Sequence, residues 1–136
     1  MAWSHKGNRS ANLHGFCYMG AVIGHPMGMQ DSQSLARPVT LCVLLWANPG
    51  TASGLIAYED KVLGIAAEYG GRVIQRARNG GDDHALEVQP LEIQTLRFPS
   101  QQAVEAFMAD ERRQALADER DRVVAMTEVI AVQLAS

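Results

Sequence analysis

The sequence predicts an α+β domain of the ferredoxin-like type, in which residues 39–136 follow the order β-α-β-β-α-β. Three observations lead to this prediction. A continuous apolar run precedes a segment with helical periodicity; two short strand-like runs then flank a loop rich in Gly and Asp; and a second helical segment leads into a final run rich in Val. Such an order places four strands in one antiparallel sheet with two helices on one face.

The first half of the domain holds a strand, a helix and a second strand. Residues 39–46 (VTLCVLLW) are apolar throughout, which predicts a central strand buried on both faces. Asn48 and Pro49 predict the N-cap and the first residue of a helix that ends before the glycine pair 70–71. Residues 72–78 (RVIQRAR) predict the next strand. The apolar stripe of the helix consists of Leu55, Tyr58, Val62, Ala66 and Tyr69.

The second half repeats this pattern after a loop. Residues 79–85 (NGGDDHA) predict a turn and loop, and residues 91–98 (LEIQTLRF) predict the third strand. Ser100 is placed to cap a second helix, which we expect to continue to about residue 125 through a charged, solvated stretch. Residues 127–134 (TEVIAVQL) predict the last strand.

The composition of the 136 residues excludes some classes of protein. Apolar residues make up 47% and charged residues 20%, as in an ordinary globular protein, and the net charge of −3 argues against a nucleic-acid binder. The apolar run 16–23 is too short to span a membrane. We therefore expect no nucleic-acid or membrane partner. Because two cysteines make no disulfide framework, we also expect a cytoplasmic protein.

Residues 1–38 differ in kind from the rest of the chain. They are rich in Gly, Ser, Asn, His and Met, follow no period, and predict a poorly ordered tail or arm. The side chains in this tail that are able to bind metal follow no compact zinc spacing, so we expect no metal site. These side chains are His5, His14, Cys17 and His25.

The first strand is apolar on both of its sides. Two helices cover only one face of a four-stranded sheet, so the other face needs a different cover. A second copy of the same sheet is the economical cover, and we therefore expect a twofold-symmetric homodimer. The alternating residues are Leu41, Val43 and Leu45 on one side, and Cys42, Leu44 and Trp46 on the other.

Four short motifs resemble those of one known group. They make residues 39–134 similar to the dimeric α/β-barrel proteins, and within these to the uncharacterised group called domain of unknown function 1330. Arg97 and residues 107–112 (FMADER) depart from the pattern of that group. The resemblance implies that two sheets of a dimer enclose a barrel-like interior. The motifs are Asn48-Pro49, Tyr69-Gly70-Gly71-Arg72, Phe98-Pro99-Ser100 and the Val-rich run 129–132.

The resemblance leaves two functions open. The first is a cofactor-free monooxygenase or isomerase that takes a small organic molecule into a cavity between sheet and helices. The alternative is a non-catalytic module that binds a metabolite or forms a dimer. We expect no cofactor: a haem needs a histidine in an apolar pocket, and His84 lies in a polar loop.

Two arginines on neighbouring strands are candidates for ligand binding. Arg76 either lines a pocket and pairs with an anionic substrate through its planar fork, or pairs with a carboxylate such as Glu92. Arg97 on the third strand is the second candidate, since strand pairing can bring it to the same surface as Arg76. Strict alternation in the second strand places four residues on one face. They are Arg72, Ile74, Arg76 and Arg78.

Two other residues are candidates for the same ligand site. Trp46 ends the first strand, and either forms the wall of an aromatic pocket or packs in the core. His84 is chemically suited to act as a general base, but it is equally a solvated histidine of a loop.

Overall fold

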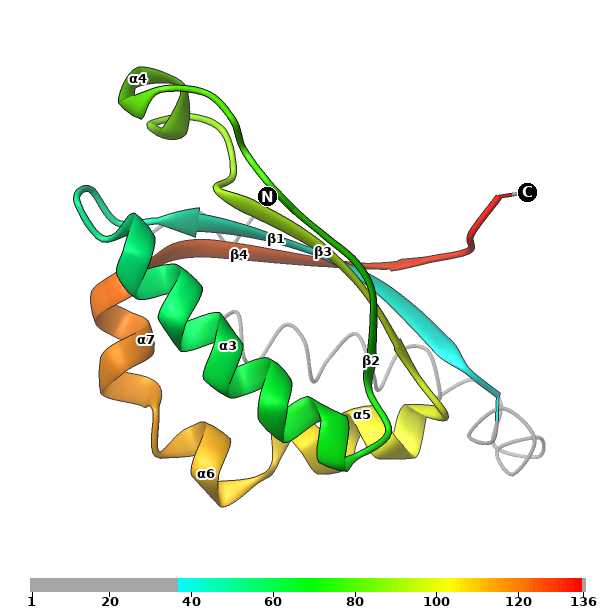
Figure 1. Ribbon diagram of the computed structural model, residues 1–136. Coiled ribbons are helices and arrows are strands. Elements are labelled where there is room, and N and C mark those ends of the chain that lie inside the picture. Colours follow the sequence, from blue (N-terminus) through cyan, green and yellow to red (C-terminus); the bar gives the residue numbers. More distant parts are fainter. Residues whose placement is uncertain (1–36, 136) are drawn as a thin grey trace.

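The structure of the protein, a computed structural model, describes residues 37–135. In chain order its elements are β1 (Val39–Ala47), α3 (Ala52–Glu68), β2 (Arg72–Arg78), α4 (Asp83–Leu86), β3 (Glu92–Phe98), α5 (Gln101–Met108), α6 (Glu111–Gln114), α7 (Ala117–Val123) and β4 (Val124–Val132). The strands form one antiparallel sheet in the order β2-β3-β1-β4 (Figure 1). This confirms the predicted ferredoxin-like α+β fold. Residues 1–36 of the expected tail lie outside the described residues.

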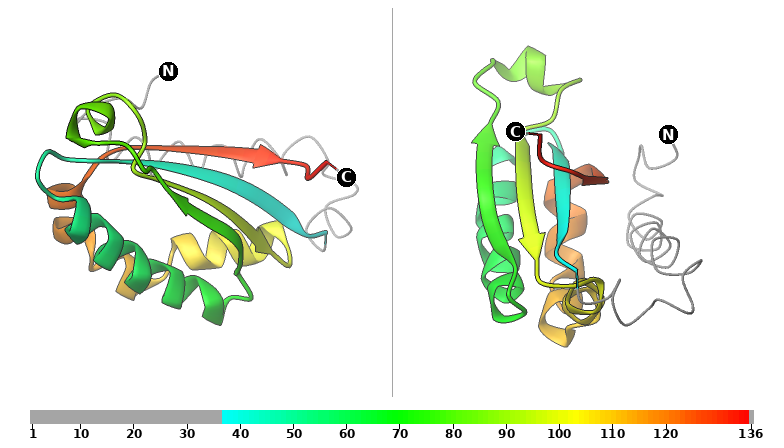
Figure 2. Two further views of the ribbon diagram at one scale, coloured as in Figure 1. Left: turned by 45° about the horizontal axis from the view of Figure 1, so that its top comes forward. Right: turned by 90° about the vertical axis from the view of Figure 1, so that its right-hand side faces the viewer.

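The helices form a single layer beneath the sheet. Figure 2 shows α3 and the segment from α5 to α7 on the same face, with neither of them on the opposite face. Short α4 stands apart, beyond one end of the sheet. Among the described residues, no helix is long and apolar enough to cross a membrane.

A turn, rather than a helix, follows the first strand. The carbonyl of Asn48 accepts from the backbone N–H of Thr51 at 3.1 Å, and Gly50 has φ of +75°. Proline and then a glycine with positive φ at the two central positions are the signature of a type II β-turn. The expectation that Asn48 caps a helix beginning at Pro49 is therefore wrong. Instead, the Asn48 side chain donates to the carbonyls of Asp121 and Arg122.

The second helical segment is broken into three pieces. Ser100 caps α5 as expected, since its hydroxyl accepts from the N–H of Ala103 at 3.1 Å. The expected continuous helix then fails at Asp110, whose side chain accepts from the N–H groups of Arg112 and Arg113 and begins α6. The chain consequently bends between α5 and α6 and again between α6 and α7, so that it passes alongside α3 (Figure 1). The last strand begins at Val124 rather than residue 127.

The loop between the second and third strands contains more order than expected. Asp82 accepts from the N–H of Ala85 at 3.0 Å and begins the short helix α4 within the segment predicted to be a plain turn and loop. At the other end of that loop, Trp46 Nε1 donates to the carbonyl of Val88 at 3.1 Å.

A bulge in β2 changes which arginines share a face. The register with β3 shifts between Val73 and Gln75, so Ile74 has no partner in the ladder. Arg76 and Arg78 remain on the helix side of the sheet, whereas Arg72 lies opposite Arg97 on the outer side. The expectation that Arg72 shares a face with Arg76 and Arg78 is wrong, because one inserted residue reverses the alternation.

The core lies between the sheet and the helices. Leu41, Leu45 and Phe98 contribute from the strands and are almost fully buried, and Leu55 contributes from α3. Gly70 ends α3 as expected, with φ of +82°.

Candidate functional site

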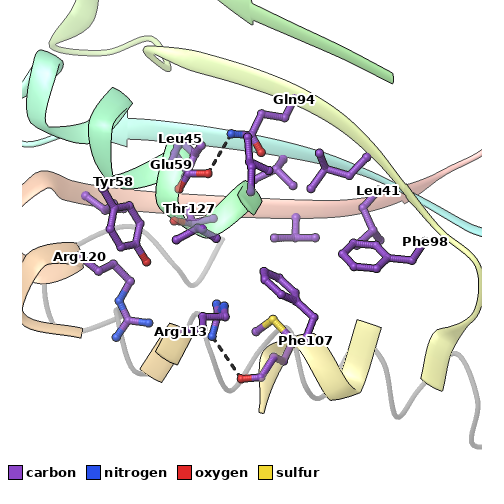
Figure 3. Close-up of a pocket in the computed structure, with 17 residues that line it drawn as sticks. Leu41, Leu45, Tyr58, Glu59, Gln94, Phe98, Phe107, Arg113, Arg120 and Thr127 are labelled. Carbon is purple, nitrogen blue, oxygen red and sulfur yellow. Dashed lines mark hydrogen bonds between the residues drawn. The ribbon is translucent and has the colours of Figure 1, made fainter. Parts of the chain in front are cut away.

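A cavity of about 100 Å³ lies between the sheet and the helices of the described chain. Its two ends differ in character (Figure 3). Leu41, Phe98 and Phe107 surround an apolar end, and polar side chains gather toward the other end. Those polar residues are Tyr58, Glu59, Gln94, Arg113, Arg120 and Thr127. An apolar body with a few convergent polar groups is the usual character of a small-molecule site.

Glu59 is a buried carboxylic acid on the wall of this cavity. It follows Leu55 by four residues and precedes Val62 by three, so α3 presents it on its buried face. Its side chain is only 5% exposed. Burial raises the pKa of Glu59 to about 7, against the lowering effect of a hydrogen bond from Gln94. A carboxyl with this pKa is able to take up and release a proton near neutral pH.

Gln94 connects Glu59 to a second buried carboxylate. Its Nε2 donates to Glu59 Oε1 at 2.9 Å and to Glu92 Oε2 at 2.7 Å. Glu92 is fully buried, and both of its oxygens accept from arginines of β2, one from Arg76 Nε and one from Arg78 Nε. The alternative in which these arginines pair with Glu92 is thus confirmed.

Two arginines reach the polar end of the cavity from α6 and α7. Arg113 Nη1 donates to the carbonyl of Met108 at 3.4 Å, and its guanidinium carbon lies 5.3 Å from the centre of the Phe107 ring. Arg120 Nε is buried and has no hydrogen-bond acceptor among the described residues. Its ion pair with Asp121 Oδ1 is long, at 3.8 Å.

Tyr58 completes the polar end, next to Glu59 on α3. Burial raises the pKa of Tyr58 to about 12, with a further contribution from the charge of Glu59, whereas Arg113 and Arg120 act to lower it. The hydroxyl therefore stays protonated at neutral pH and is able to donate a hydrogen bond.

The four residues predicted from the sequence to bind a ligand do not line this cavity. Arg76 lies outside the cavity lining, where it forms an ion pair with Glu92. Arg97 lies on the outer sheet face, where its Nε donates to the hydroxyl of Thr40 at 3.3 Å. Arg76 pairs with Gln94 and shares its face of the sheet, whereas Arg97 lies three residues further along β3 and therefore on the opposite face. The expected surface shared by Arg76 and Arg97 does not exist.

The other two predicted residues are also placed away from the cavity. Trp46 holds the loop that carries α4. The side chain of His84 is 91% exposed, and its Nδ1 lies 3.6 Å from Glu87 Oε1. No group of side chains in residues 37–135 is arranged to hold a metal ion, and the tail histidines lie outside the described residues.

Sequence reasoning overlooked the polar residues that do line the cavity. Glu59 sits within the apolar stripe of α3, and its spacing from Leu55 and Val62 was the available signal. Gln94 shares strand parity with Leu96, so it also belongs to the buried side. Arg113 and Arg120 lie in the stretch expected to be a solvated surface, and its break into short helices could not be read from charge spacing.

Comparisons with known proteins identify the fold. No family model matches the chain, and no curated protein matches it. Solved structures do match. A protein of unknown function from Rhodopseudomonas palustris is 14% identical with a TM-score of 0.61, and the match covers 82% of this chain and 92% of that one. The chain has the ferredoxin-like fold.

Two further neighbours carry a description of activity. SnoaB from Streptomyces nogalater, a cofactor-independent oxygenase, is 12% identical with a TM-score of 0.57, over 74% of this chain and 96% of that one. A putative antibiotic biosynthesis monooxygenase from Bacteroides thetaiotaomicron is 11% identical with a TM-score of 0.56, over 72% and 90%. At such identities the likeness shows the fold alone. The resemblance to domain of unknown function 1330 stays a prediction.

Proposed function

We propose that this protein binds a small organic molecule in the cavity and that Glu59 removes a proton from a carbon atom of that molecule. The observation that carries the proposal is the buried carboxyl of Glu59, with a pKa of about 7, on the cavity wall. A general base works best when its pKa is close to the ambient pH.

Removal of a proton from carbon is the first step of both reactions expected for this chain. In an isomerase, the carbanion or enolate takes a proton back at another atom. In a cofactor-free monooxygenase, it reacts with O2: a CH2 group becomes C=O, which keeps one oxygen atom, and the other leaves as water. The substrate supplies the electrons in this second case, so no reductant is required. The oxygenase among the structural neighbours supports this second course by fold analogy.

Exchange of carbon-bound hydrogen tests the shared step. The full chain is incubated in D2O with acetoacetate, phenylpyruvate or phenylacetone, and loss of the C–H signal is followed by NMR. We expect exchange above the buffer rate with at least one of them, and a loss of about 100-fold or more in Glu59→Gln, as for removal of a general base. Glu87→Gln, an exposed residue of the α4 loop, is the matched control.

The outcomes separate the two functions that the sequence leaves open. Absence of exchange, or exchange that survives in Glu59→Gln, overturns the catalytic proposal. Saturable binding without exchange would instead support the non-catalytic binding module. An oxygen electrode then divides the catalytic cases, since a monooxygenase consumes O2 with the exchanging compound and an isomerase does not.

We also propose that a second copy of the chain covers the outer sheet face. Ile93 and Ile130 on that face remain 41% and 45% exposed, and the long helical segments lie on the other face. Sedimentation equilibrium tests this proposal. Ile130→Glu is expected to produce monomers, whereas Val88→Glu in the α4 loop, 75% exposed, leaves the mass unchanged. A monomeric native chain overturns it.

A further inference from the structure

We propose that the polar end of the cavity is an anion-binding site in which Arg120, assisted by Arg113, holds a carboxylate of the ligand. The inference deepens the proposed function, and rests on it, by naming the substrate class: a small organic acid with an apolar body.

Arg120 carries the first part of the argument. Its side chain is 18% exposed, and its buried Nε lacks a hydrogen-bond acceptor in residues 37–135. Buried donors in native proteins are nearly always satisfied, so a missing acceptor points to a group that binds there. Asp121 Oδ1, 3.8 Å from Nε, is beyond hydrogen-bond distance and belongs to a half-exposed side chain.

The nearby carboxylates have other partners. Glu119, which acts electrostatically on Tyr58, accepts from Lys61 Nζ at 2.9 Å. Glu59 accepts from Gln94 on the far wall of the polar end. Of the charged residues that line the cavity, Glu59 is acidic, and Arg113 and Arg120 are basic. Because Glu59 is half protonated near pH 7, the lining itself carries net positive charge.

The hydrogen-bond donors of Arg113, Arg120 and Tyr58 are gathered at one end of the cavity. Arg113 is held in place by the carbonyl of Met108 and the ring of Phe107. In Figure 3 its guanidinium, that of Arg120 and the Tyr58 hydroxyl all lie at the same end of the cavity. Planar guanidinium groups match the two oxygens of a carboxylate, and a tyrosine hydroxyl is able to donate a third hydrogen bond.

The cavity limits the rest of the ligand. A volume of about 100 Å³ is of the order that holds a single ring or a short branched chain. Leu41, Phe98 and Phe107 form the apolar end that receives it. With its carboxylate at the arginines, the body of the ligand lies along the cavity wall that carries Glu59.

A pair of fluorinated probes tests the anion site. Binding of 4-fluorobenzoate and of neutral 4-fluorobenzyl alcohol to the full chain is measured by fluorine NMR, since the two share one ring and differ in charge. We expect the benzoate to bind about tenfold more tightly or better. Arg120→Met removes this preference without weakening the alcohol, and Arg120→Lys retains part of it. Arg122→Met, an exposed arginine of the same helix, is the matched control.

Several results of these binding measurements would contradict the proposed anion-binding site. Equal binding of the two probes, no binding of either at millimolar concentration, or a preference that survives in folded Arg120→Met or is complete in Arg120→Lys would do so. Failure of the proposed function is distinct. A preference that depends on Arg120 and persists in Glu59→Gln, without hydrogen exchange, leaves the anion site standing alone. Exchange of neutral phenylacetone without any anion preference leaves the proton transfer standing alone.

Discussion

The side-chain amide of Gln94 donates to the buried carboxyl of Glu59 across 2.9 Å. This hydrogen bond favours the ionised carboxylate and lowers its pKa against the effect of burial. Gln94 is therefore a positioning residue for the proposed base, since it orients the carboxyl and adjusts the pH at which it ionises.

Gln94→Leu is expected to raise the pKa of Glu59 above about 7. The rate of hydrogen exchange should then rise with pH at a more alkaline midpoint than in the native protein, because the base must be ionised to act. The pH profile of exchange measures this shift. Gln102→Leu, at an exposed position of α5, serves as control, and an unchanged midpoint in Gln94→Leu would contradict the role.

Glu59 also makes folding depend on pH. Its pKa rises from an ordinary value of 4.5 in the unfolded chain to about 7 in the folded one. The folded state therefore binds more protons between these values, and stability present below pH 4.5 is lost as the pH rises through 7. A shift of this size corresponds to about 3 kcal/mol.

Glu59→Gln should remove this loss. Relative to the native chain, the variant is expected to gain stability as the pH increases from 4.5 to 8, with little difference at the acidic end. Urea unfolding across that range measures the difference, and a constant difference would show that Glu59 is not held neutral by burial.

Asp110 is expected to have the opposite effect. Hydrogen bonds from Arg112 and from the Tyr69 hydroxyl, the latter at 2.6 Å, hold the pKa of Asp110 well below its ordinary value of 3.8. Its contribution to stability is thus present above pH 3.8 and disappears as the pH falls through the lowered pKa. Asparagine caps a helix as well as aspartate does, so Asp110→Asn isolates the charge.

This variant should be less stable than the native chain at pH 7, and should recover only part of the difference at pH 3, because the lowered pKa of Asp110 lies further down. Thermal unfolding at the two values makes the comparison. Asp118→Asn, an exposed residue in the first turn of α7, is the matched control. A deficit of Asp110→Asn that is as large at pH 3 as at pH 7 would rule out the ionic contribution.

The order of elements was predictable because each depends on local patterns: an apolar run, a helical stripe, a glycine pair and a serine cap. The residues of the candidate site were harder to predict from the sequence. Glu92 and Gln94 are polar residues of a predicted strand, yet both are buried between the sheet and the helices. Parity with Leu96 within the strand indicates their burial, but the partners that satisfy them there, Arg76, Arg78 and Glu59, come from other elements, and no single segment identifies those partners.

Two backbone irregularities account for the errors in β2 and in the second helical segment. The bulge at Ile74 reverses the alternation of β2, and no residue in RVIQRAR marks it. Asp110 begins a new helix because its carboxylate competes for backbone N–H groups, and this turns Arg113 and Arg120 toward the cavity. Charge spacing along an assumed straight helix predicts the opposite.

The arginine pair on Glu92 gives the last prediction. Glu92 is fully buried and accepts from both Arg76 and Arg78. Removing both partners leaves an uncompensated buried carboxylate, so the double variant Arg76→Met/Arg78→Met should lose about 3–5 kcal/mol of stability. Adding Glu92→Met to this variant should recover most of the loss, because the charge that needed partners is gone. Arg72→Met, on the other face of the same strand, should cost little. Urea unfolding of the native chain and of these variants measures the free energies of unfolding to be compared. A triple variant no more stable than the double one would mean that the arginines act through packing rather than through the charge of Glu92.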